Sequence, residues 1–495
     1  MIPVLLIAIP LVAGLIAFFV KSEGAVKGWA LFSALVTLGV SAIGIAFVKD
    51  ATLLAAQYDW MGALNSSFSV KLDGLGQVLC LLNAVAFPII FISTWKSQYE
   101  KPNRFFALML LMQAGMMGVF LSTDALLFYF FWELALIPAY FLCSQWGGPR
   151  RIPVTFKFFI YTFVGSLLML VGIIYIYYHT RNHSFDMKAF YTAMLSSRQQ
   201  GWLFWLLFIA FAIKMPIFPF HTWQPDTYEQ SPTAVTMALS GVMVKMGVFG
   251  LLRWLLPVVP YASWAWGDTV STMAVVGMIY ASLIAISQDD IKRLVAYSSI
   301  AHIGLMCVTI FSLQQVGMQG VMIQLFNHGI NIIGLWIAAE LIERQFGTRK
   351  LSELGGLAQK APALAISFVI IALANIALPL TNAFVGEFLM FNGIFNSKAT
   401  HYNVWLTVFA GICIILAAVY TLNLIRKIFY GNVSGVVASA TDIKMNEKFV
   451  LGVIIVMIFW MGIYSEPFLK ITEKFSADVT NGIILRPEIS KYLNK

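Results

Sequence analysis

Long apolar runs follow one another along almost the whole chain. About 14 runs of roughly 17–25 mostly apolar residues alternate with short polar segments, and each is long enough to cross roughly 30 Å of hydrocarbon as a helix. The bilayer interior offers no water to backbone N–H and C=O groups, so a spanning segment has to satisfy them within a helix or a closed barrel. The pattern therefore predicts an all-α polytopic membrane protein with about 14 transmembrane helices.

Composition excludes a soluble globule. Apolar residues make up 60% of the chain and charged residues 11%, against roughly 25% charged residues in soluble domains. The expected spans lie near 1–20, 28–48, 73–95, 105–121, 124–143, 156–178, 202–219, 232–256, 269–287, 293–311, 317–341, 362–397 (interrupted), 403–430 and 448–464.

The basic residues behind the net charge of +9 are distributed unevenly over the loops between the expected spans, numbered in chain order. The odd-numbered loops contain 18 Lys and Arg residues and the even-numbered loops contain 7. Positively charged loops stay in the cytoplasm, so we expect the odd loops on that side, and both Met1 and Lys495 on the outer side. Because these loops, the C-terminal tail and two intramembrane lysines account for every basic residue, no basic patch is left to bind nucleic acid.

Two of the expected spans are interrupted in the same way. Span 7 reads IAFAIKMPIFPFHTWQPD (209–226), with Pro216 and Pro219, and span 12 reads LPLTNAFVGEFLMF (378–391), with Pro379. Proline removes a helix hydrogen bond and breaks the helix. The two interruptions are five spans apart, so they stand in opposite orientations, as in an inverted-topology repeat of spans 4–8 and 9–13. Two ordinary Pro-kinked packing helices remain the alternative, since proline is common in membrane helices.

This organisation divides the chain into four segments. We expect three N-terminal spans in 1–100, a first half-channel of spans 4–8 in 101–260, a second, inverted half-channel of spans 9–13 in 261–432, and the last span with a C-terminal tail in 433–495.

Four ionisable residues lie inside these apolar runs: Glu133, Lys214, Lys245 and Glu387. A charge in the bilayer core costs at least a few kcal/mol, and such residues usually mark an ion or proton path. Glu133 and Lys214 are expected to form a pair. The alternatives are a purely structural ion pair for Glu133 and, for Lys214, a side chain that reaches the interface.

Lys245 and two histidines extend this set. Lys245 has Gly241 and Gly247 nearby, which allow close helix approach, and burial disfavours its charged form, so it could exchange a proton. His302 and His328 also lie within apolar runs. Histidine can relay protons near neutral pH, although both could instead be hydrogen-bonded packing residues.

Redox and nucleotide signatures are missing from the sequence. The four cysteines occur singly, and there is no Walker loop, no dinucleotide-binding glycine motif and no pair of haem ligands. We therefore expect this chain to bind no cofactor of its own and to perform acid–base chemistry only.

Five motifs carry a family resemblance: FYFFWELALIP (128–138), WGGPRR (146–151), KMPIFPFHTWQPDTYEQSPT (214–233), VKMG (244–247) and NAFVGEF (382–388). Together they resemble the antiporter-like subunits of respiratory complex I, a family that also includes the large subunits of Mrp-type sodium/proton antiporters. The likeness covers almost the whole chain. A length near 500 residues and a glutamate at 387, where the L and N chains usually carry lysine, are typical of the M-type branch.

The resemblance implies a role for each buried ionisable residue. Glu133 and Lys214 would be the charged pair of the first half-channel, Lys245 the central proton carrier, His302 and His328 relays, and Glu387 the terminal site.

The resemblance also implies partners and a location. The partner subunits would hold NADH, FMN, the iron–sulfur clusters and the quinone. The L and N chains and the small membrane subunits would be neighbours in a bacterial inner membrane, with both termini of this chain periplasmic. A subunit of an Mrp-type antiporter is the alternative function, and a purely structural membrane scaffold is a third.

Overall fold

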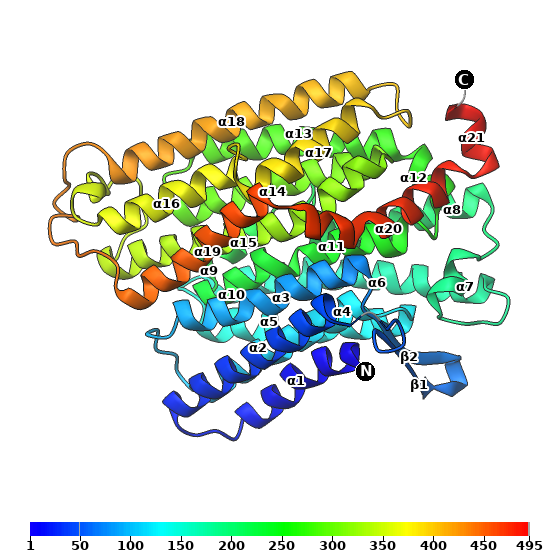
Figure 1. The fold of residues 1–495 in the computed structure, drawn as a ribbon, viewed down its shortest axis with the longest axis horizontal. Coiled ribbons are helices and arrows are strands. Elements are labelled where there is room, and N and C mark those ends of the chain that lie inside the picture. The colour runs from blue at the N-terminus through cyan, green and yellow to red at the C-terminus, as the bar shows by residue number, and fades with distance from the viewer. Residues whose placement is uncertain (49, 494–495) are drawn as a thin grey trace.

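The computed structural model describes residues 1–48 and 50–493, except the side chains of Glu488, Tyr492 and Leu493. Most helices run side by side along the long axis of the molecule (Figure 1). Met1 and α21 lie toward the end that carries α7 and the β-hairpin, in keeping with an even number of spans. Lys49 and Lys495, which enter the charge and topology predictions above, lie outside the described residues.

The first part of the chain contains α1 (Ile2–Ala17), α2 (Glu23–Ala46), β1 (Ala55–Met61), η1 (Gly62–Leu64), β2 (Ser66–Lys71), α3 (Gly74–Ser93), α4 (Pro102–Leu121), α5 (Ala125–Trp146), α6 (Arg151–His179), α7 (Met187–Tyr191), α8 (Ser197–Lys214) and α9 (Trp223–Gln230). One long helix follows, made of α10 (Thr233–Ala238), η2 (Leu239–Met243), α11 (Lys245–Gly250) and η3 (Leu251–Leu255).

The remainder contains α12 (Pro260–Ala265), α13 (Gly267–Ser287), α14 (Ile291–Phe311), α15 (Gln315–Phe346), η4 (Leu357–Gln359), α16 (Pro362–Asn375), α17 (Asn382–Phe395), α18 (Asn403–Phe429), α19 (Met445–Ile463), α20 (Glu466–Ile484) and α21 (Pro487–Leu493).

The helical membrane fold predicted from the apolar runs is confirmed. Within the described residues, 11 helices are long and apolar enough to cross a membrane, and Ile2–Ala17 and Pro362–Asn375 are shorter apolar helices. The number of 14 spans remains a prediction.

A β-hairpin and a C-terminal pair of helices were not among the elements predicted from the sequence, which were spans joined by loops. Strands β1 and β2 form an antiparallel hairpin with a register shift between Asp59 and Met61, and Asn65 occupies the left-handed region at the turn. Beyond the last span, α20 and α21 form helices in the expected C-terminal tail, for which no secondary structure was predicted. Neither element contains an apolar run of spanning length, so the length of apolar runs predicts neither of them.

Both predicted helix breaks are present. The chain leaves helical structure between Lys214 and Trp223, and again between Asn375 and Asn382. At the first break the indole Nε1 of Trp223 donates to the carbonyl of Ile213 at 2.9 Å. Side-chain hydrogen bonds of this kind satisfy backbone groups that the break leaves without helical partners.

Corresponding helices of the two halves pack in the same way. Helix α4 packs on α5 as α13 packs on α14. Helix α6 packs on both parts of the first broken helix, α8 and α9, as α15 packs on both parts of the second, α16 and α17. This correspondence is what the inverted-repeat interpretation predicts. The division into four segments remains a proposal, and its boundary at 260/261 cuts α12.

The helix from Thr233 to Leu255 is buried along its whole length and contains two π-helical segments, Leu239–Met243 and Leu251–Leu255. Single π-helical turns inside α-helices occur frequently at functional sites. Lys245 lies just beyond the first of them and Arg253 lies within the second.

Candidate functional site

Lys245 lies at the centre of a buried polar cluster. Its side chain is 1% exposed. The ammonium Nζ donates to the carbonyl of Ser240 at 2.6 Å and lies 2.9 Å from Nδ1 of His328. Ser240 belongs to the π-helical turn that precedes Lys245, so this irregular turn supplies one of the two groups that hold the ammonium.

The two predicted relay histidines come together from different helices. His328 on α15 places Nε2 3.2 Å from the hydroxyl of Ser299 on α14. The rings of His328 and His302 are 5.7 Å apart between centroids. A neutral imidazole presents one donor and one acceptor nitrogen, so each ring can accept a proton at one atom and release one at the other.

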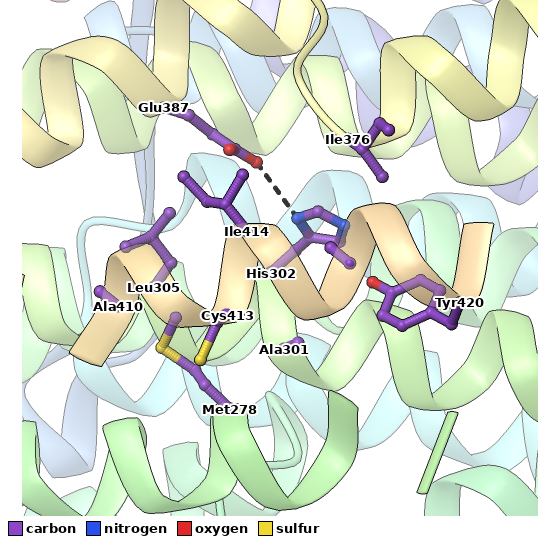
Figure 2. A pocket seen from close by; sticks show the side chains of 11 residues that line it. Met278, Ala301, His302, Leu305, Ile376, Glu387, Ala410, Cys413, Ile414 and Tyr420 are labelled. Carbon is purple, nitrogen blue, oxygen red and sulfur yellow. Dashed lines mark ion pairs between the residues drawn. The ribbon is translucent and has the colours of Figure 1, made fainter. Parts of the chain in front are cut away.

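Glu387 completes the line. Its Oε1 lies 3.2 Å from Nδ1 of His302, and both side chains are buried (Figure 2). They border a cavity of about 20 Å³ that Tyr420 and Cys413 also line, which is room for about one water molecule. The described structure therefore brings Lys245, His328, His302 and Glu387 from four helices into one row. Polar contacts join the first two and the last two residues, and the two histidine rings face each other at 5.7 Å.

Asparagines at the second break hold this series in place. The side chain of Asn375 lies 3.3 Å from Nε2 of His302. Asn382 lies at the start of α17, and its side-chain amide exchanges two hydrogen bonds with that of Asn331, each 3.0 Å long. The backbone carbonyl of Asn382 accepts a third hydrogen bond, from the side chain of Asn327 at 2.7 Å. These contacts fix the start of the helix that carries Glu387.

Glu133 and Lys214 are not in direct contact. No ion pair within 4 Å joins them among the described residues. The Lys214 ammonium lies 5.4 Å from the ring centroid of Trp132, which is the neighbour of Glu133 in the chain, and it has no hydrogen-bond partner among the described residues. Lys214 is buried and Glu133 is half-buried. The predicted pair is thus brought close through Trp132, while its ionic contact remains a prediction.

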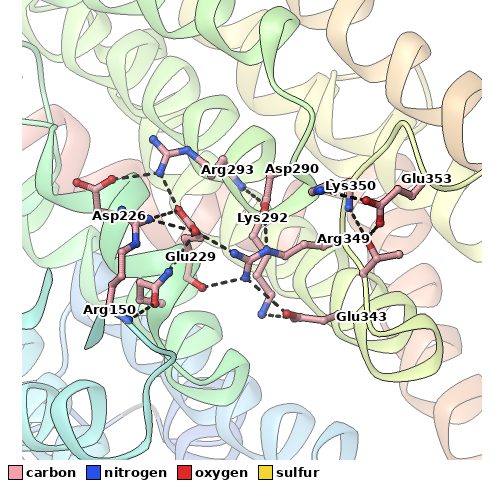
Figure 3. Close-up of polar contacts among 12 residues, drawn as sticks. Arg150, Asp226, Glu229, Asp290, Lys292, Arg293, Glu343, Arg349, Lys350 and Glu353 are labelled. Atoms are coloured by element: carbon pink, nitrogen blue, oxygen red, sulfur yellow. Dashed lines mark hydrogen bonds and ion pairs between the residues drawn. The ribbon is translucent and has the colours of Figure 1, made fainter. Parts of the chain in front are cut away.

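An ionic cluster that the sequence analysis did not identify surrounds α9 (Figure 3). Glu229 pairs with Arg293 at 2.7 Å, Arg349 at 2.9 Å and Arg150 at 3.3 Å. These arginines come from α14, from the segment after α15 and from the loop before α6. The second part of the first broken helix is therefore fastened by charge to both halves of the molecule.

Asp226 extends the cluster one turn earlier on α9. It pairs with Lys157 at 2.9 Å and with Arg293 at 3.1 Å. Burial disfavours the charged forms of Asp226 and Glu229, but the surrounding cations outweigh it and hold the pKa of each carboxyl below its ordinary value. The sequence did contain a sign of this cluster, because Asp226 and Glu229 both follow the helix break within the motif at 214–233.

The chain belongs to the family of antiporter-like membrane subunits. A family model described as "NADH:quinone oxidoreductase/Mrp antiporter, TM" matches residues 122–417, a range that contains all six predicted site residues.

Full-length relatives narrow this assignment to the M type. The chain is 33% identical over 487 residues to the F(420)H(2) dehydrogenase subunit M of Methanosarcina mazei, covering 95% of this chain and 96% of that protein. It is 35% identical over 431 residues to the NADH-quinone oxidoreductase subunit M of Rickettsia conorii, covering 86% and 85%. The M-type resemblance predicted from the motifs is confirmed.

Solved structures support the same fold. A chain of respiratory complex I from Thermus thermophilus with bound NADH matches with a TM-score of 0.90 and 25% identity, over 98% of this chain and 100% of that one. A chain of the Mrp complex from Dietzia sp. matches with a TM-score of 0.85 and 20% identity, over 100% of this chain and 55% of that one. The latter likeness is one of fold alone.

Proposed function

We propose that this chain is the M-type, proton-translocating membrane subunit of an NADH:quinone oxidoreductase. The observation that carries the proposal is the row of buried side chains from Lys245 through His328 and His302 to Glu387, which come from four helices. Intramembrane ionisable residues in contact with one another are typical of proton relays.

In this proposal the residues act as an acid–base chain. Lys245 releases a proton from Nζ to Nδ1 of His328. Nε2 of that ring releases its own proton by way of the Ser299 hydroxyl, which lies 3.2 Å away, toward His302, which accepts a proton at Nε2. Nδ1 of His302 then hands a proton to the carboxylate of Glu387, from which it leaves through the adjoining cavity. Each transfer returns the donor to its neutral or anionic form, so the chain can be reloaded at Lys245.

Glu133 and Lys214 are proposed to control the loading of Lys245. When the Lys214 ammonium is drawn toward Glu133, Lys245 experiences less positive repulsion and holds its proton. When Lys214 moves away from Glu133, the added repulsion favours release toward His328. Moving a proton against about 150 mV requires roughly 3.5 kcal/mol, at about 2.3 kcal/mol per 100 mV, and pairing changes between poorly solvated charges are of that size.

Partners and location are proposed from the relatives. Electron transfer from NADH through FMN and iron–sulfur clusters to quinone belongs to other subunits, and the L- and N-type chains and small membrane subunits are the proposed neighbours. We propose a bacterial inner membrane, with the odd-numbered loops and the ionic cluster around Glu229 on the cytoplasmic side and both termini outside. An Mrp-type antiporter subunit is less favoured, because the M-type relatives match over 85–96% of their own length at 33–35% identity.

The proposal is tested by purifying the native complex through a tag on this chain. Copurifying subunits with NADH:quinone reductase activity that acidifies sealed vesicles would support it. Copurification of antiporter subunits alone, with sodium-driven proton movement and no quinone reduction, would replace it with the alternative. A relative of the F(420)H(2) type makes the electron donor the first variable to assay.

A further inference from the structure

A second buried charge lies on the same helix as Lys245. Arg253 is eight residues further along, about 12 Å at 1.5 Å per residue, and is 4% exposed. Its Nη2 donates to Asp73 at 2.6 Å, and Asp73 caps the start of α3 by accepting from the backbone of Gly76. The proposed proton series does not use this pair.

Residues of α7 and α20 pack around the pair on the side away from Lys245. The guanidinium lies 4.7 Å from the ring centroid of Phe475 on α20, and the hydroxyl of Tyr191 donates to the carbonyl of Arg253 at 2.8 Å. A Cβ on Gly74 would lie 2.2 Å from the carbonyl oxygen of Ile471, so α20 is packed directly against the start of α3. These contacts hold the pair between α3, α7 and α20.

A cavity ends at this pair. It measures about 360 Å³ and is lined by Lys71, Asp73, Tyr191, Arg253, Phe475, Asp478 and Arg486, among others. It lies at the end of the molecule where α7 and α20 are found (Figure 1), which is the outer end in the proposed topology. Its volume and charged lining suit water, whereas Lys245 is buried about 12 Å deeper along its helix.

A layer of aromatic rings separates the pair from Lys245. Phe249, one turn from each, has ring centroids 5.6 Å from Phe120 and 6.2 Å from Phe128. Phe128 in turn lies 5.2 Å from Trp254. All four rings are buried, so a layer made mostly of apolar ring atoms lies between Arg253 and Lys245 on this side of the helix.

We propose that the Arg253–Asp73 pair, backed by Phe475 and the ring layer, seals the first half-channel against the outer cavity and prevents protons from flowing back to Lys245. The inference rests on the proposed function. Arginine stays protonated in proteins, and a fixed arginine in a narrow passage excludes protons and cations. A buried ion pair is often replaceable by apolar residues without loss of stability, so stability alone does not explain its presence here.

The test measures passive proton entry into sealed proteoliposomes that contain the whole complex and a trapped pH dye, after an acid pulse and without electron donor. Arg253→Met removes the fixed cation and leaves Asp73 as a proton acceptor facing the cavity. We expect a rise of roughly tenfold in proton entry, as for loss of the repulsion that a unit charge exerts on Lys245 over about 12 Å at an effective dielectric of about 20. Arg253→Lys should leak less than Arg253→Met.

Lys71→Met is the matched control, because Lys71 lines the same cavity outside the pair, and it should not raise the leak. An assembled Arg253→Met complex with wild-type proton entry, or an equal leak in Lys71→Met, would overturn the seal. If Arg253→Met does not assemble, Phe475→Ala decides, with a raised leak supporting the seal and a wild-type leak rejecting it. The leak assay involves no turnover, so its result is independent of the pumping assay. The seal can be rejected while the role of Glu387 in pumping is upheld, and the role of Glu387 can be rejected while the seal is upheld.

Discussion

Glu387→Gln is the sharpest test of the proposed series. The substitution keeps the size of the side chain and its ability to accept a hydrogen bond, and removes only the negative charge. Glu387 faces His302 at 3.2 Å in a site where both side chains are buried. The change therefore addresses charge, with little change in packing.

The magnitude follows from that distance. Two unit charges 3.2 Å apart attract by about 5 kcal/mol at an effective dielectric of about 20. Moving a proton against about 150 mV requires roughly 3.5 kcal/mol. The attraction between a protonated His302 and the Glu387 carboxylate is thus comparable with the energy that transfer against the gradient requires. A neutral amide supplies almost none of this energy, so proton transfer should fall at least tenfold.

The assay compares donor-driven acidification of sealed vesicles with quinone reductase activity in the same preparation. Glu447→Gln is the matched control, because Glu447 is another 5% exposed carboxylate, paired with Arg344 at 2.5 Å at the start of α19 and outside the series. Glu387→Lys should retain part of the transfer, since a buried lysine can also carry a proton. Normal pumping by Glu387→Gln at wild-type assembly would show that protons leave by another route.

Three further outcomes are expected. Glu133→Gln should assemble but lose most pumping in the same vesicle assay, because a neutral partner cannot draw the Lys214 ammonium away from Lys245. Glu133→Asp should lose less pumping. Full pumping by Glu133→Gln would exclude the proposed role of Glu133. Cysteines placed in 146–155 should be labelled only from the cytoplasmic side and those in 179–200 only from outside, and an outside label at 150 would reverse the topology. Glu229→Gln should destabilise α9 by about 2 kcal/mol through lost charge-assisted hydrogen bonds, measured by amide hydrogen exchange. Because the folded-state pKa of Glu229 is lowered, the wild-type advantage should be complete above about pH 4.5 and disappear as the pH falls through that lowered pKa; a difference that grows in acid would contradict this.

The sequence was sufficient for features that obey local rules. Apolar run length predicts the helices, because the hydrocarbon thickness sets it. Proline predicts both helix breaks, since it cannot donate to the helix ladder. The cost of burying a charge singles out Lys245 and Glu387, and both lie in the buried series that the structure describes.

Contacts between distant parts of the chain could not be predicted in this way. Asp73 and Arg253 are 180 residues apart, and no local pattern links the cap of one helix to a residue within a π-helical turn of another. The cluster around Glu229 likewise joins three arginines that come together only after the helices pack. Its acids were visible in the sequence, but their partners depend on tertiary structure.

The two ends of the proposed path differ in a way that bears on how it works. At one end the Lys214 ammonium lies over Trp132 and has no hydrogen-bond partner among the described residues. At the other, His302 and Glu387 are in contact. We call a pair closed when its two side chains are in contact. If both Glu133–Lys214 and His302–Glu387 were closed at once, each charge would be stabilised by its partner, and no unpaired charge would be left to drive the next proton transfer. One open pair and one closed pair fit a cycle with two alternating states, in which each pair opens as the other closes. A variant that locks Glu133 onto Lys214 should therefore stop turnover with every proton-carrying residue intact.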